Sequence, residues 1–169
     1  MRVWRGPRTD PELAAIETVY RERFRSFVRL ATAITGNEQS ALDAVHDGFV
    51  RAVRYRSTLR NRESAPGWVC RIVLNEARKR SAVEGRYVPT SVAALGEGAA
   101  ANGHDELGAA AAALATLPER QRLALFLRYY ADLDYAAIAE ALGVARGTVS
   151  ATLHAARSNL QTKLEEVNT

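Results

Sequence analysis

The sequence has one cysteine, Cys70, few aromatic residues and no long hydrophobic run. A single cysteine cannot form an intrachain disulfide, which fits a reducing compartment. No segment approaches the ~18 consecutive apolar residues of a membrane-spanning helix. The first ten residues are basic, but the apolar stretch of a secretory signal does not follow them. These absences argue against a disulfide-stapled scaffold, and they predict a cytoplasmic protein without membrane insertion.

Groupings of residues that support catalysis or metal binding are also missing. The three histidines, His46, His104 and His154, are far apart, and no cysteine or acidic cluster stands at ligand spacing. The sequence contains no phosphate-cradling glycine loop, no nucleophile elbow and no pair of catalytic carboxylates. We therefore expect neither an enzyme nor a bound metal or cofactor.

Charge is distributed unevenly along the 169 residues. The formal net charge of +4 divides into +7 for residues 1–81, −3 for residues 82–115 and zero for the rest. A basic front half favours a polyanionic partner, because each neutralised phosphate releases condensed counterions. A surface kept basic for solubility is the alternative at this point.

Apolar periodicity predicts an all-α fold, with two small helical domains joined by a flexible linker. In residues 9–81, Thr9 or Asp10 can cap a first helix, which Gly36-Asn37 ends, and Ser64-Ala-Pro66 starts the third. Three apolar stripes in about 70 residues suffice for a helical bundle. The stripes are Leu13, Ile16, Tyr20, Phe24, Phe27, Ala31 and Ile34; then Leu42, Val45, Phe49 and Val53; then Trp68, Ile72 and Val73.

The linker and the second domain differ in composition. Residues 82–113 are rich in glycine, mildly acidic and weakly periodic, which is typical of a linker. In residues 114–164, Leu117-Pro118-Glu119 opens a helix, and Asp134 can cap a short one that follows. The expected apolar side of the first of these helices consists of Leu123, Phe126, Leu127 and Tyr130.

The strongest local pattern runs from Tyr135 to His154 and predicts a helix-turn-helix. Ala139 suits the close crossing of two helices, Gly143 suits a turn at positive φ, and Val149 can pin the second helix to the first. That helix would lie in the major groove. An ordinary helical hairpin is the alternative. The side chains expected to face DNA are Arg146, Thr148, Ser150, Thr152, His154 and Arg157.

A second pattern lies on the third helix of the front domain. Basic side chains cluster near Trp68, after a polar loop, and this combination suits DNA with unpaired bases. A solvated basic face with Trp68 in the core is the alternative. The candidate residues are Asn61, Arg62, Trp68, Arg71, Asn75, Arg78 and Lys79, with Arg80 at the end of the cluster.

Taken in order, these segments resemble the extracytoplasmic-function sigma factors of bacterial RNA polymerase. The resemblance spans about residues 19–164, and its most specific part is Leu-Pro-Glu-Arg-Gln-Arg at 117–122 before a helix-turn-helix. It implies that residues 41–54 dock on the polymerase clamp, that residues 63–80 open and read the minus-ten element, and that the helix-turn-helix reads the minus-thirty-five element. In the docking helix, Phe49 is expected in the core, and the exposed candidates are Asp43, Asp47, Arg51 and Arg54.

The resemblance also implies partners for this protein, and two alternative functions remain open. Core RNA polymerase and promoter DNA are the expected partners, together with an inhibitory anti-sigma protein, and the free chain is expected to bind DNA poorly. Gly48, in the docking helix, costs roughly 1 kcal/mol against alanine and either loosens that helix or permits a close approach. A neutral second domain predicts weak upstream binding. The alternatives are a stand-alone helix-turn-helix regulator and a degenerate sigma-like protein that docks without reading DNA.

Overall fold

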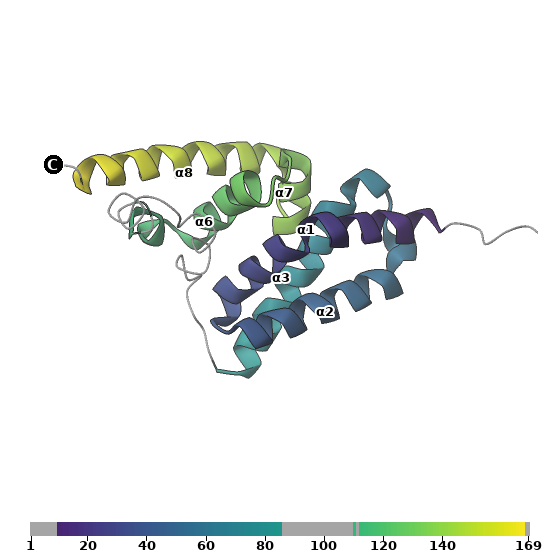
Figure 1. The fold of residues 1–169 in the computed structure, drawn as a ribbon. Helices are drawn as coiled ribbons and strands as arrows, with labels where there is room; N and C mark the ends of the chain where they lie inside the picture. Colours follow the sequence, from purple (N-terminus) through teal and green to yellow (C-terminus); the bar gives the residue numbers. More distant parts are fainter. Residues whose placement is uncertain (1–9, 86–109, 111, 168–169) are drawn as a thin grey trace, which may run out of the picture.

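The structure is a computed structural model that describes residues 10–85, 110 and 112–167. Its front domain contains three long helices, α1 (Pro11–Thr35), α2 (Glu38–Arg54) and α3 (Ala65–Val83). Two short 3-10 turns, Arg56–Thr58 and Arg62–Ser64, connect α2 to α3. Each long helix packs against the other two, as Figure 1 shows. The described residues contain helices and turns without a strand, so the all-α prediction is confirmed.

Local signals in the sequence set the ends of these helices. The Asp10 carboxylate accepts a hydrogen bond from the Leu13 amide at 3.0 Å and caps α1. A hydrogen bond from Arg56 lowers the pKa of the Asp10 carboxyl, so the cap is charged at neutral pH. Gly36 ends α1 at φ 67°, where glycine is favoured. Asn37 then caps α2 by accepting from the Ser40 amide at 2.9 Å. The predicted caps and stops are confirmed, and Thr9 lies outside the described residues.

The front core differs in part from the predicted stripes. Ile16, Phe27, Ala31, Ile34, Val45, Phe49 and Val73 are buried as expected. Tyr20 and Val53 were predicted to be buried but are 41% and 37% exposed, and Leu13, Phe24, Leu42, Trp68 and Ile72 are only half-buried. The reason is that α2 turns a side of small residues inward, which lets its neighbours approach closely. That side consists of Ala41, Ala44, Gly48 and Ala52.

Gly48 lies where α2 and α3 pack against each other. A Cβ at this position would lie 2.7 Å from Val73 Cγ2 and 3.1 Å from Val73 Cα. Gly48 was predicted either to loosen its helix or to permit a close approach, and the structure supports the second: α2 and α3 approach closely at this residue. The Val73 side chain is stiff and completely buried, so it has little room to move aside.

Gly48→Ala is expected to lower the free energy of unfolding by up to about 2 kcal/mol. Overpacking costs about 1–3 kcal/mol, and the gain of about 1 kcal/mol in helix propensity offsets only part of it. Gly147→Ala, at a helical position with nothing within 4 Å of the added Cβ, is expected to stabilise by about 0.5–1 kcal/mol. Urea unfolding followed by circular dichroism compares the two. Equal stabilisation of both variants would contradict the packing account.

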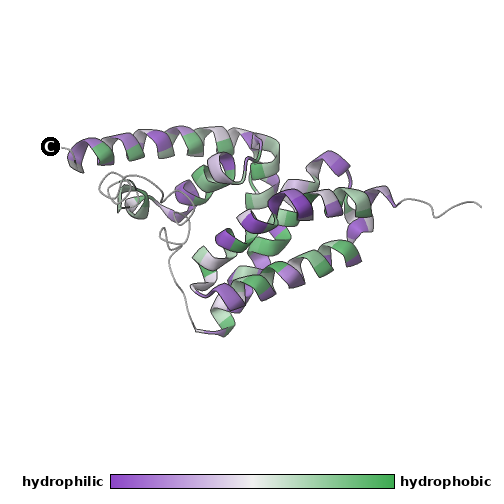
Figure 2. Cartoon of the chain, viewed as in Figure 1, coloured by the Kyte–Doolittle hydropathy of each residue, from purple (hydrophilic) through white to green (hydrophobic). Residues whose placement is uncertain are grey.

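The second domain is a smaller bundle. Residues 112–116 are helical, and they precede α6 (Glu119–Leu125), a π-helical turn (Phe126–Tyr130), α7 (Tyr135–Leu142) and α8 (Arg146–Val167). Leu123, Leu127 and Ile138 are buried in it, and Figure 2 shows polar and apolar segments alternating along α8, as expected of an amphipathic helix. Tyr130 was predicted on the apolar side but is 37% exposed, because the π-helical turn displaces it from that stripe.

Arg122 joins the start of this domain to α6. Its side chain is buried and donates hydrogen bonds to the carbonyl oxygens of Ala115 at 3.0 Å and Leu117 at 2.5 Å. Carbonyl oxygens at the end of a helix have no hydrogen-bond partner within the helix. The bonds that they accept from Arg122 offset the free-energy cost of burying its guanidinium. Arg122 belongs to the Leu-Pro-Glu-Arg-Gln-Arg run, which gives that motif a structural role.

The two domains touch each other. In Figure 1, α7 lies beside α3, and the contact between α7 and α3 is the most extensive one between the domains. Most of the predicted linker, residues 82–113, lies outside the described residues; α3 itself continues to Val83. No helix in the described part of the chain is long and apolar enough to span a membrane.

Candidate nucleic-acid interface

A helix-turn-helix forms from α7 and α8, as predicted. The Asp134 carboxylate caps α7 by accepting from the Ala137 amide at 2.7 Å. Gly143 adopts φ 64° in the turn, and the Val144 amide donates to the Ala139 carbonyl at 3.0 Å. The helix crossing buries Ile138, Ala139 and Val149, with 9% exposure or less for each. Since Ala139, Gly143 and Val149 occupy the expected places, this local prediction is confirmed.

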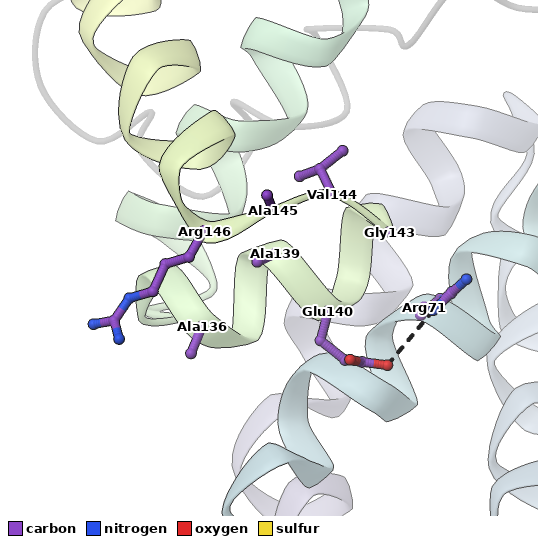
Figure 3. Close-up of a pocket in the computed structure, with 8 residues that line it drawn as sticks. All are labelled: Arg71, Ala136, Ala139, Glu140, Gly143, Val144, Ala145 and Arg146. Atoms are coloured by element: carbon purple, nitrogen blue, oxygen red, sulfur yellow. Dashed lines mark ion pairs between the residues drawn. The ribbon is translucent and has the colours of Figure 1, made fainter.

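The outer face of α8 is available to a ligand. Arg146, Thr148, Ser150, His154 and Arg157 are exposed, and Thr152 is half-buried. The Arg157 guanidinium donates to the Tyr135 hydroxyl at 3.2 Å, which ties this end of the face to α7. Arg146 stands at the first position of α8, and Figure 3 shows its guanidinium directed away from α3. A helix N-terminus with a cation beside it suits a phosphate.

The basic cluster on α3 forms a continuous stripe. Arg71, Asn75 and Arg78 follow one another at helical steps of four and three, so they share one face, and Lys79 lies next to them. All four are exposed, as are Asn61 and Arg62 in the preceding loop. Trp68 packs partly against the core, so its ring is only half available for stacking. The Asn61 side chain accepts from the Glu63 amide at 3.0 Å and thereby shapes that loop.

Ion pairs tie the predicted docking face of α2 to α3. Arg80 lies 2.7 Å from the Asp47 carboxylate and 3.4 Å from that of Asp43. The hydrogen bond that Arg80 donates to the Asp47 carboxylate raises the pKa of the Arg80 guanidinium. Arg51 pairs with Glu76 at 2.9 Å. The sequence grouped Arg80 with the DNA-facing cluster, whereas the structure directs it to α2.

An apolar strip on α2 was missed by the sequence reasoning. Val50 is 64% exposed and Val53, one helical turn further along, 37%, while Tyr55 at the C-cap of the helix is 46% exposed. The Arg54 guanidinium is 5.8 Å from the centre of the Tyr55 ring. Exposed apolar side chains beside a cation are typical of protein contact surfaces. The sequence signal for this strip was Val50, an apolar residue that lies outside the predicted apolar stripe of its helix.

Cys70, on α3, is completely buried. Burial raises the pKa of its thiol to about 12, so it stays protonated at neutral pH. His46 and His154 are exposed, and His104 lies outside the described residues. Within the described ranges, no three histidine, cysteine or acidic side chains gather as a metal site would require.

Residues predicted for two different DNA contacts meet at one open groove. Arg71 of α3 lies on one wall, and Glu140, Gly143, Val144 and Arg146 of the helix-turn-helix lie on the other. Figure 3 shows the ion pair across it, between Arg71 and Glu140, whose charged atoms are 3.6 Å apart. Sequence reasoning could not find this juxtaposition, because it depends on how the two domains pack.

Comparison with known proteins gives two family matches that follow the domains. Residues 19–86 match Sigma-70 region 2, and residues 107–160 match Sigma-70, region 4.

Two similar curated proteins cover nearly the whole chain. The ECF RNA polymerase sigma factor EcfG of Rhodopseudomonas palustris (strain TIE-1) is 30% identical over 163 residues, which are 92% of this chain and 83% of that protein. RNA polymerase sigma factor SigV of Bacillus subtilis (strain 168) is 28% identical over 155 residues, covering 89% of this chain and 92% of its own length.

Proposed function

Because the chain belongs to the extracytoplasmic-function family of RNA polymerase sigma factors, we propose that it directs core RNA polymerase to specific promoters and helps to open the DNA there. The observation that carries this proposal is the pair of surfaces described above. One is the exposed basic stripe on α3, and the other is the outer face of α8 in the helix-turn-helix. Members of such a family regulate transcription and are not enzymes in their own right.

The front domain, residues 9–81, is proposed to do two things. Its α2 face, with Asp43, Asp47, Arg51 and Arg54, docks on polymerase, and the exposed Val50 strip extends that surface. Its α3 stripe holds the melted minus-ten strand. Unstacking a base costs a few kcal/mol, which stacking on Trp68 and contacts from Arg71, Asn75, Arg78 and Lys79 offset.

The second domain, residues 114–164, is proposed to hold the minus-thirty-five duplex. The first turns of α8 would enter the major groove, with Arg146 and Arg157 on phosphates and Thr148, Ser150, Thr152 and His154 nearer the base edges. Residues 82–113 connect the two contacts, and two weak contacts on one chain reinforce each other through effective concentration. The chain would act in the cytoplasm, where polymerase and DNA are found, and an anti-sigma protein would hold it inactive.

Run-off transcription with core polymerase from the same organism tests the proposal. Genomic fragments are transcribed with and without the chain, and discrete transcripts that require the chain are expected. Stable binding to core without any transcript would favour the degenerate docking protein. Absence of core binding, with specific duplex binding at a palindromic site, would favour the stand-alone regulator.

A further inference from the structure

Polar and charged side chains of α2 and α3 form a regular ladder where these two helices pack side by side (Figure 1). The contributing positions are three or four residues apart on α2, and four apart on α3 and its C-cap, so each helix offers a single face. Positions rise along α2 as they fall along α3, so the two helices run antiparallel. The contacts of the ladder are Ser40 with Glu84, Asp43 and Asp47 with Arg80, and Arg51 with Glu76.

The central contact of this ladder joins one guanidinium to two carboxylates. One terminal nitrogen of Arg80 lies 2.7 Å from the Asp47 carboxylate, and the other lies 3.4 Å from that of Asp43. Asp43 and Asp47 are four residues apart on one helix, a spacing at which like charges repel each other. The Arg80 cation offsets this repulsion. Because its donors form a rigid fork, it also fixes where both carboxylates point.

In these ion pairs the partner on α3 is less exposed than the partner on α2. The Arg80 side chain is 33% exposed, against 46% for Asp43 and 54% for Asp47. Glu76 is 13% exposed, against 48% for Arg51. The α3 charges therefore lie beneath the α2 charges and do not cover them. A carboxylate has about four lone-pair sites, so Asp43 and Asp47 keep sites that can accept hydrogen bonds from another protein.

The ladder coincides with the face of α2 that is proposed to dock on polymerase. Three of the four docking side chains, Asp43, Asp47 and Arg51, belong to the ladder. A side chain that is already held in its bound orientation loses less conformational freedom on binding. Support from α3 is therefore expected to strengthen docking, even though partly exposed ion pairs add little to the stability of the free chain.

We propose that Arg80 is a positioning residue for polymerase docking, which acts through Asp43 and Asp47 and not by contact with DNA. This inference rests on the proposed sigma-factor function and assigns a residue to one step of it. Glu76 underlies Arg51 in the same way. One helix, α3, then serves both tasks of the front domain, since its exposed stripe faces DNA and another side supports the docking face.

Two measurements on the full-length chain test the role of Arg80. The chain is titrated onto immobilised core polymerase to obtain its affinity, and run-off transcripts are quantified with the chain at saturation. Arg80→Ala is expected to weaken core binding roughly 3- to 10-fold, because two docking side chains must then be ordered on binding. The transcript yield at saturation is expected to change by less than about 2-fold, since the DNA stripe is intact.

Three results would contradict the positioning role. A lower yield at saturation with unchanged core affinity would return Arg80 to the DNA contacts. Tighter core binding by Arg80→Ala would mean that Arg80 masks the docking carboxylates. Equal core affinity and equal yield would leave Arg80 without a part in either step.

A conservative variant and a matched control separate positioning from the loss of one charge. Arg80→Lys is expected to bind core more tightly than Arg80→Ala but more weakly than the unaltered chain, because an ammonium lacks the fork that reaches both carboxylates. Arg21→Ala removes the same charge at an exposed position of α1 and is expected to bind core within about 2-fold of the unaltered chain. Circular dichroism verifies that each variant keeps its helix content.

A double-mutant cycle shows whether Arg80 acts through the two carboxylates. In a chain that carries Asp43→Asn and Asp47→Asn, adding Arg80→Ala is expected to weaken core binding by less than about 2-fold, because the side chains that it positions are already altered. An equal loss in both backgrounds would overturn the proposal. If the unaltered chain does not bind core, the proposed function fails and this inference fails with it. Core binding without any transcript would count against the sigma function alone, since the affinity comparison still decides the role of Arg80.

Discussion

Reversing two charges on α3, by Arg78→Glu together with Lys79→Glu, is expected to lower run-off transcription roughly 100-fold. Both side chains are exposed on the stripe proposed to hold the melted strand. Each contact between a charged donor and a phosphate contributes about 1.5 kcal/mol, and the loss of two corresponds to a factor of roughly 100 in binding. Repulsion by the new carboxylates acts in the same direction. Transcript yield at limiting protein concentration is the measurement.

The matched control is Arg21→Glu with Arg25→Glu. Both arginines are exposed on α1, outside the proposed DNA and polymerase contacts, and the change in net charge is the same. Yield within about 2-fold of the unaltered chain is expected there, because long-range effects of exposed charges are screened beyond about 8–10 Å. Unchanged transcription in the α3 variant would reject DNA reading by this helix and would favour the degenerate docking protein.

Phe27→Ala is expected to lower the free energy of unfolding of the front domain by about 3–5 kcal/mol. Phe27 is completely buried, and its ring packs near Phe49 with 6.1 Å between the ring centres. The substitution would leave a cavity beside Phe49, which the surrounding helices fill only in part. The total free energy of unfolding of a small domain is about 5–15 kcal/mol, so the substitution would remove much of its stability. Urea unfolding followed by circular dichroism measures the change.

Tyr20→Ala is the control, since Tyr20 occupies the same predicted stripe of α1. Its side chain is 41% exposed and contacts Phe49 edge-on, with 5.0 Å between ring centres. Its ring also lies 4.9 Å from that of Phe24, between ring centres. A loss of about 1–2 kcal/mol is expected, from these two aromatic pairs and partial burial. If the two variants lost equal stability, the predicted stripe would describe the core better than the observed packing does.

The sequence by itself determined the local features of this protein. Asp10, Gly36, Asn37, Asp134 and Gly143 act within a few residues of themselves, by capping a helix or adopting positive φ. Their effects therefore follow from residue type and spacing. The helix-turn-helix is of the same kind, because its close crossing, turn and pinning residue all lie within about 20 residues.

Only the tertiary structure decided which faces the helices bury. Apolar periodicity predicted Tyr20 and Val53 in the core, but the small residues of α2 set a closer helix spacing that leaves both at the surface. The same packing gave Gly48 its role against Val73. Arg80 was grouped with the DNA-facing cluster by its charge alone. Its pairing with Asp43 and Asp47 depends on how α2 and α3 pack against each other.

The contact between the domains was likewise beyond the sequence. Gly67 lies against Ala137 and Arg71 against Glu140, and the two partners of each pair are separated by about 70 residues, with no periodicity to link them. A glycine near the start of a helix carries no sign of what will approach it, and a surface arginine can face DNA or a carboxylate with equal ease. Short-range hydrogen bonding and helical spacing determined the parts of this protein, whereas steric fit between distant helices decided how they are held together.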